Sequence, residues 1–130
     1  MWDEKERKVK TRATIICLQS GKILLVRKKA GKWHFPGGTI EFHETPSMAA
    51  ERELREETSI KGHGLLSLCT LRVGSTLHYI FTTQLDDGEK PLASNEIVAC
   101  KWVLREKLLS TDLKASAAAL LSRQLPALSA

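Results

Sequence analysis

The sequence offers few features of a secreted, zinc-binding or membrane-embedded protein. Its only cysteines are Cys17, Cys69 and Cys100, an odd number, set far apart in apolar segments. Such cysteines are typical of reduced thiols in a core rather than of a disulfide framework. No Cys-x-x-Cys pair or Cys/His cluster with zinc-ligand spacing occurs, because the four histidines also stand well apart. A soft-metal site is therefore not expected.

Long hydrophobic runs are also missing. No apolar stretch approaches the roughly 20 residues that cross a bilayer, and the N-terminal segment MWDEKERKVK is charged where a signal peptide is apolar. We expect a cytoplasmic protein without a membrane-spanning segment. At 130 residues with 42% hydrophobic composition, residues 1–130 should form a single domain with a charged leader over residues 1–10.

Positive charge is in excess, but it lacks the pattern of a nucleic-acid groove. The 20 Lys and Arg residues against 15 Asp and Glu give a net charge of +5. This balance fits an anionic partner, from a nucleotide to a nucleic acid, or a solvated surface rich in lysine. No tract interleaves Arg with aromatic residues, which make up only 5% of the chain. We expect a small-molecule partner and no long nucleic acid.

Turn residues divide the chain into short strands. Runs rich in β-branched and apolar residues predict strands over residues 11–18, 22–28, 64–73, 76–85 and 97–104. Residues 30–38 read as a loop in which Pro36, Gly37 and Gly38 permit close backbone approach.

Two helices complete the predicted fold. Thr45 is a good N-cap and Pro46 suits the first helical position, so the first helix should run to about Thr58. Asp112 is expected to cap a last helix, whose apolar face would hold Leu113, Ala117, Leu120 and Leu121. This order of elements indicates an α/β fold, with a mixed sheet and helices covering its faces.

Three carboxylates form a stripe on the first helix. Helix residues turn by about 100° each, so Glu53, Glu56 and Glu57 fall on one side. Ala49 and Ala50 lie one turn earlier on the same side and leave room for a ligand or another segment. The stripe is a solvated acidic face or, if it turns toward the protein, a site for a hard cation. Oxygen ligands alone favour Mg²⁺ or Mn²⁺.

Residues 38–60 carry a spaced pattern of glycine, acids and one arginine. Its members are Gly38, Glu44, Arg52, Glu53, Leu54, Glu56, Glu57 and Ile60. The pattern resembles the Nudix box of the Nudix hydrolases. Ser59 departs from the family's helix-ending Gly, and His43 follows Phe42 where many members have Pro-Gly. Neither position is a metal ligand in the family, although Ser adopts a left-handed C-cap less readily than Gly.

The resemblance extends more loosely through residues 12–18, 24–27, 33–38 and 96–102. It implies a short MutT-like member with a Nudix-like α/β/α sandwich around a central mixed β-sheet. It also implies hydrolysis of a nucleoside diphosphate linked to another group X, with Mg²⁺ or Mn²⁺ as the cofactor.

The resemblance assigns roles to the residues of the box. The metal ligands that it implies are Glu53, Glu56, Glu57 and the backbone carbonyl of Gly37. The metal would bridge the diphosphate and activate an attacking water. Arg52 and Glu44 would orient the carboxylates through charge-assisted hydrogen bonds, or would simply pair at the surface.

Further candidates lie outside the acidic stripe. Arg27 either contacts a substrate phosphate or is an exposed Arg at a strand end. Trp33 either stacks on a base or covers the core, and Gly37 and Gly38 would let the substrate approach the backbone. Glu96 lies in a polar loop before a strand, where the resemblance implies an additional acid that acts as metal ligand or general base; otherwise it is a solvated loop residue.

Two classes of function stay open. The first is an Mg²⁺-dependent pyrophosphohydrolase that cleaves a (d)NTP or oxidised dNTP to a nucleoside monophosphate and pyrophosphate, as a monomer or homodimer. Dinucleoside polyphosphates and nucleotide sugars are alternative substrates, since loops outside the box read base, sugar and X. The second is a non-catalytic nucleotide-sensing module on the same fold. Three acids on one stripe are more than a pure binder needs, which favours the enzyme.

Overall fold

The computed structural model describes residues 9–61, 64–125 and 128, so most of the predicted leader lies outside the described residues. The elements in chain order are β1 (Lys10–Gln19), β2 (Lys22–Lys28), β3 (Gly37–Thr39), α2 (Pro46–Thr58), β4 (Leu66–Val73), β5 (Thr76–Gln84), β6 (Ile97–Leu104), the 3₁₀ helix η1 (Arg105–Ser110) and α3 (Ala115–Leu121). Lys10 already belongs to β1, so the predicted leader is too long by this residue. The helices in the described part of the chain are all too short or too polar to cross a membrane.

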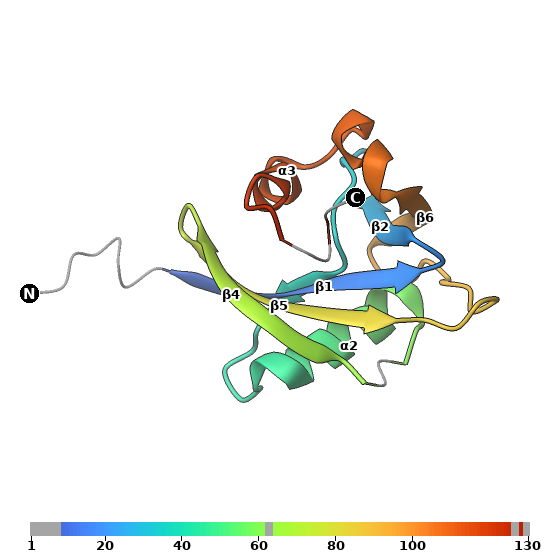
Figure 1. Ribbon diagram of the computed structural model, residues 1–130. Coiled ribbons are helices and arrows are strands. Elements are labelled where there is room, and N and C mark those ends of the chain that lie inside the picture. The colour runs from blue at the N-terminus through green and yellow to red at the C-terminus, as the bar shows by residue number, and fades with distance from the viewer. Residues whose placement is uncertain (1–8, 62–63, 126–127, 129–130) are drawn as a thin grey trace, which may run out of the picture.

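Strand β1 lies at the centre of a mixed sheet with the order β4-β5-β1-β2-β6 (Figure 1). It pairs in parallel with β5, while the β4–β5 and β2–β6 pairs are antiparallel. The other edge of β1 is shared, because Leu18 and Gln19 pair with β2 whereas residues 12–14 pair with β3. This division brings Gly37 and Gly38, both in β3, beside the start of β1.

Helices cover both faces of this sheet. On one face, Ala49 and Leu54 of α2 belong to the same buried core as Ile15 of β1. On the other face, Ile16 of β1 lies in a second core with residues of η1 and α3, among them Leu120. Ile15 and Ile16 serve different cores because side chains alternate along a strand. The predicted α/β fold with a mixed sheet between helical layers is confirmed.

The sequence chemistry predicts both ends of α2. The Thr45 hydroxyl accepts a hydrogen bond from the Met48 N–H at 3.1 Å, and Pro46 occupies the first turn. The helix ends at Ser59, which has the left-handed angles φ 63° and ψ 9° and donates its N–H to the Arg55 carbonyl at 2.9 Å. Ser59 therefore takes the conformation in which glycine would be less strained.

Replacing Ser59 with glycine should leave stability unchanged or raise the free energy of unfolding by up to about 1 kcal/mol. Glycine relieves the left-handed strain, but Ser59→Gly also loses the 3.2 Å hydrogen bond from the Ser59 hydroxyl to the Leu92 carbonyl and gains freedom when unfolded. Urea denaturation measures the balance. A clear loss of stability would show that the hydroxyl contact outweighs the strain.

The prediction that Asp112 caps the last helix is wrong. Helix α3 begins at Ala115, after Lys114, and no side chain caps it. The Asp112 carbonyl instead accepts the Trp33 N–H at 3.0 Å, and the Lys114 N–H donates to the Trp33 carbonyl at 2.8 Å. These bonds to a segment distant in sequence hold Asp112 outside the helix, so α3 begins only at Ala115.

Four further differences concern short segments. Strand β4 begins at Leu66 rather than at residue 64, and β5 ends at Gln84 rather than at residue 85. The 3₁₀ helix η1 follows β6 without having been predicted. Gly37 and Gly38 lie in β3 rather than in a loop, since this three-residue strand exists only through its pairing with β1.

Candidate functional site

The acidic stripe of α2 faces a cleft. Glu53, Glu56 and Glu57 line a hollow of about 470 Å³ together with Asn95 and Glu96, which precede β6. We call this hollow the acidic cleft. The structure therefore brings Glu96 to the box carboxylates, although about 40 residues of chain separate them. The stripe is not a purely solvated helix face.

The loop before β6 is held in place by the C-terminal end of α2. The last carbonyls of a helix lack partners within the helix, and here the loop supplies them. The Asn95 side chain donates to the Glu56 carbonyl at 2.8 Å, and the Ser94 hydroxyl donates to the same oxygen. The Leu92 N–H donates to the Thr58 carbonyl at 2.8 Å. These bonds fix the position from which Glu96 reaches the cleft.

Arg52 neutralises much of the stripe. Its guanidinium binds both carboxylate oxygens of Glu44, at 2.6 and 2.8 Å, and also contacts Glu53 at 2.9 Å and Glu56 at 3.3 Å. Hydrogen bonding to Arg52 lowers the pKa of Glu44 to about 2, and the same bond raises the pKa of Arg52. Arg52 and Glu44 thus form a bidentate pair next to two of the cleft carboxylates.

Gly37 and Gly38 let the backbone of β3 lie against these side chains. The Gly37 N–H donates to the Glu57 carboxylate at 2.8 Å. A Cβ on Gly37 would collide with the Ala13 carbonyl oxygen, and one on Gly38 would collide with the Glu53 carboxylate. Gly37 therefore needs glycine, because a Cβ there would meet backbone, whereas the Glu53 carboxylate beside Gly38 is the end of a flexible side chain that can move aside.

Glu57 is the buried member of the stripe, with 8% of its surface exposed. Burial raises the pKa of Glu57 to about 7, opposed by the Gly37 N–H and by Arg12 and reinforced by Glu53. A buried carboxylate needs a cation or a proton. The cleft carboxylates offer only oxygen, the donor set that Mg²⁺ and Mn²⁺ prefer. These residues therefore fit a hard divalent cation.

The carboxylates must turn to bind a cation together. Among residues 9–61, 64–125 and 128, no three acidic, His or Cys side chains already converge on one point. The reason is visible in the contacts, because Arg52 draws Glu53 and Glu56 to itself while Gly37 holds Glu57. Rotation of Glu53 and Glu56 away from Arg52 would direct their oxygens into the cleft.

Basic side chains line a second hollow together with several carboxylates. Arg12, Lys28, His34 and Lys114 line a hollow of about 230 Å³, which we call the basic cavity, and it adjoins Glu53, Glu57 and Glu96. The sequence analysis did not identify any of these four residues as part of the site. Lys28 alone stands next to a predicted site residue, Arg27. The position of the Arg12 side chain is fixed by the hydrogen bond that it donates to the Phe35 carbonyl at 3.2 Å. This is a contact between segments distant in sequence.

Arg27 and Trp33 lie together, outside the described lining of the acidic cleft and the basic cavity. The Arg27 guanidinium is 5.4 Å and the Lys101 ammonium 4.3 Å from the centre of the Trp33 ring. Trp33 is half-buried and also packs against the core under η1 and α3. Trp33 thus makes cation–π contacts on its ring and also packs against the core. The predicted contacts of Arg27 and Trp33 with substrate remain predictions.

Comparison with known proteins agrees with this geometry. The NUDIX domain family matches residues 8–124, which is almost the whole chain. The chain belongs to the Nudix family. The segment that resembles the Nudix box forms the β3–α2 unit of the domain, and its carboxylates line the acidic cleft.

Named Nudix relatives act on different nucleotides. An 8-oxo-dGTP diphosphatase of Proteus vulgaris is 36% identical over 76 residues, which cover 55% of this chain and 62% of that protein. An RNA pyrophosphohydrolase of Blochmanniella floridana is 36% identical over 106 residues, which cover 77% and 61%. The chain thus spans less than two thirds of the length of these relatives.

A solved Nudix structure supports the fold along most of the chain. It is a putative Nudix hydrolase family member from Chromobacterium violaceum, with a TM-score of 0.76 and 27% identity. The match covers 89% of this chain and 76% of that one. The match therefore supports a Nudix fold in which a mixed sheet lies between helical layers.

Proposed function

We propose that the protein is an Mg²⁺-dependent pyrophosphohydrolase that cleaves a nucleoside diphosphate linked to X. The observation that carries this proposal is a pair of adjoining hollows, in which the box carboxylates and Glu96 lie close to Arg12, Lys28 and Lys114. Such a pair suits a polyphosphate held partly through a divalent cation and partly through direct ion pairs.

A (d)NTP or an oxidised dNTP is the first substrate that we propose, with Mn²⁺ as an alternative cofactor. The name of the Proteus vulgaris relative, an 8-oxo-dGTP diphosphatase, supports this choice. The products would be a nucleoside monophosphate and pyrophosphate. A hydrolysis screen over dNTPs, oxidised dNTPs, ADP-ribose, dinucleoside polyphosphates and nucleotide sugars tests the substrate class.

The residues of the acidic cleft have two roles in this proposal, metal binding and the positioning of the metal ligands. Glu53, Glu56, Glu57 and the Gly37 carbonyl would hold the cation, which neutralises the diphosphate and lowers the pKa of the attacking water. Arg52 and Glu44 position these carboxylates through the bidentate pair.

Proton transfer falls to Glu96 in this proposal. The water oxygen forms a bond to phosphorus while the bridging P–O bond breaks, and Glu96 accepts the proton that the water releases. Glu96 is 77% exposed at its side chain and pairs with Lys28 at 3.0 Å. Its carboxylate therefore makes only an exposed ion pair, whereas Arg52 or Gly37 binds the carboxylates of α2.

Replacing Glu96 and Glu53 should separate proton transfer from metal binding. We expect Glu96→Gln to lower kcat by about 10- to 1,000-fold with little change in the Mg²⁺ concentration for half-activation. Glu53→Gln should lower the rate and also raise that Mg²⁺ concentration, because it removes a charged ligand.

The matched control is Glu106→Gln, an exposed glutamate on η1, which should leave both kinetic parameters unchanged. Steady-state rates over a Mg²⁺ titration measure these effects. Full activity in Glu96→Gln would return the general base to the carboxylates of α2.

A nucleotide-sensing module without catalysis is the alternative function. The acidic cleft holds Glu53, Glu56, Glu57 and Glu96, and binding alone would not need so many acids beside an anionic ligand. This surplus of carboxylates favours the hydrolase.

A further inference from the structure

The ring of Trp33 holds two cations close to each other. Lys101 of β6 pairs with Leu25 of β2, and Arg27 is two residues beyond Leu25, so both basic side chains rise on the same face of the sheet. Within the described chain neither cation makes an ion pair, and Arg27 reaches one other acceptor, the Lys28 carbonyl at 3.5 Å. The ring is therefore the main partner of two like charges that would otherwise repel each other.

The main chain of Trp33 holds the segment that precedes α3. Its N–H donates to the Asp112 carbonyl at 3.0 Å, and its carbonyl accepts the Lys114 N–H at 2.8 Å. Leu113, between these two residues, forms a parallel bridge with Trp33 and packs against the same core. Since no side chain caps α3, the bonds to Trp33 fix the point from which the Lys114 side chain extends.

Lys114 lines the basic cavity together with Arg12 and Lys28. A lysine side chain is a flexible four-carbon stem that ends in a point charge. The region that its ammonium group can reach therefore depends on how firmly its backbone is held. For Lys114 that backbone is held by Trp33.

Trp33 thus connects the two cations to the basic cavity. The next residue, His34, exchanges two 2.9 Å backbone hydrogen bonds with Val26 of β2, which fixes the main chain on one side of Trp33. The ring of Trp33 itself is only half-buried, so packing against the core does not hold it alone. The contacts with Lys101 and Arg27 add to what keeps the ring, and with it the bonds to the segment before α3, in place.

We propose that Lys101 and Arg27, acting through Trp33, position Lys114 to bind the substrate diphosphate. This inference rests on the proposed function, in which Lys114 forms an ion pair with the polyphosphate. Lys101, Arg27 and Trp33 all lie outside the described lining of the acidic cleft and the basic cavity, so they are positioning residues that do not touch the substrate. Their loss weakens substrate binding and leaves the chemical step unchanged.

Hydrogen exchange at the Lys114 amide tests the connection without substrate or metal. This N–H donates to the Trp33 carbonyl, so its exchange rate reports on that bond. We expect exchange to accelerate about threefold or more in Lys101→Met and about tenfold or more in Trp33→Leu. Lys101→Arg keeps a cation for the ring and should restore the slow rate.

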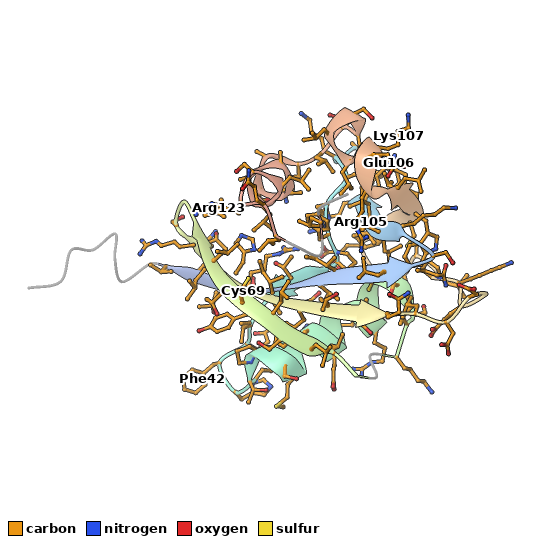
Figure 2. The ribbon with its side chains drawn as sticks, in the orientation of Figure 1. Phe42, Cys69, Arg105, Glu106, Lys107 and Arg123 are labelled. Carbon is orange, nitrogen blue, oxygen red and sulfur yellow. The ribbon has the colours of Figure 1, made fainter. Side chains whose placement is uncertain are left out.

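The control for hydrogen exchange is Lys107→Met, which removes an exposed lysine of η1 (Figure 2) and should leave the Lys114 amide unchanged. If Trp33→Leu does not fold, Lys101→Met carries the test, because it leaves the ring in place. Equal exchange in Lys101→Met and in the unaltered protein would overturn the proposal.

Steady-state kinetics test the consequence for binding. With Mg²⁺ and the dNTP that is hydrolysed fastest, we expect Lys101→Met to raise KM about threefold or more and to leave kcat within about twofold. Lys101→Arg should restore KM, and Lys107→Met should change neither parameter. Accelerated exchange of the Lys114 amide with an unchanged KM would contradict the positioning role while hydrolysis itself stands.

A double-mutant cycle with Lys114→Gln tests the route by which Lys101 acts. If Lys101 acts through Lys114, Lys101→Met should raise KM no further once Lys114 is replaced. Additive effects would show that the charge of Lys101 acts on the substrate directly, and additive effects of Trp33→Leu would show that Trp33 stacks on the base; either result overturns the proposal. A protein that hydrolyses no nucleotide would instead contradict the proposed function, and the exchange of the Lys114 amide would still decide whether Lys101 and Trp33 hold Lys114.

Discussion

Removal of divalent cations with EDTA should abolish nucleotide hydrolysis, and added Mg²⁺ or Mn²⁺ should restore it. Glu53, Glu56 and Glu57 line the acidic cleft, in which we propose that the diphosphate binds. Without a cation these carboxylates repel the substrate and nothing activates the water. Rates measured before and after chelation test this expectation, with circular dichroism as the check that the fold is retained. Turnover that persists in excess EDTA would exclude the metal-dependent mechanism.

Replacing the buried carboxylate Glu57 should reduce catalysis nearly as much as removal of the divalent cation does, and the fold should be retained. We expect Glu57→Gln to lower kcat by at least about 100-fold, because it removes one charged ligand while keeping the shape of the side chain. The amide oxygen can still accept the Gly37 N–H, and a neutral group at this buried position avoids the desolvation that raises the pKa of Glu57. Stability should therefore be unchanged or higher.

The matched control for Glu57→Gln is Glu51→Gln. Glu51 belongs to the same helix but is exposed, so its replacement should change neither kcat nor the unfolding temperature. Glu56→Gln should behave like Glu57→Gln in activity. If Glu57→Gln unfolds, or retains full activity in a folded state, Glu57 has a structural role and not a catalytic one.

Local chemistry explains why α2 and most strands could be predicted from the sequence. The Thr45 cap and Pro46 at the first turn act within a few residues of themselves, so their effect is the same in the sequence and in the fold. The spacing of Glu53, Glu56 and Glu57 follows from the helical period alone. Arg52 and Glu44 were expected to orient the carboxylates, and the bidentate pair between them, eight residues apart in sequence, is a contact that the structure adds.

Contacts between distant segments explain what the sequence did not predict. Strand β3 depends on pairing with β1, and the start of α3 depends on the bonds of Trp33 to Asp112 and Lys114. The basic cavity combines Arg12 from β1 with Lys114 from the other end of the chain. No periodicity or local spacing links such positions. Glu96 was reached through family resemblance, and its place at the cleft depends on the cap that its loop forms on α2.

Product analysis in ¹⁸O-labelled water tests the central proposal most directly. The unaltered protein and Glu56→Gln are incubated with Mg²⁺ and a panel of dNTPs, oxidised dNTPs, ADP-ribose, nucleotide sugars and a short 5′-triphosphorylated RNA, and products are followed by ³¹P NMR. We predict that a nucleoside triphosphate yields a monophosphate and pyrophosphate, one of them carrying ¹⁸O, and that Glu56→Gln forms at least about 100-fold less. Nucleotides that bind to the protein, as measured by calorimetry, and yet remain intact throughout the panel would contradict the hydrolase and support the nucleotide-sensing module.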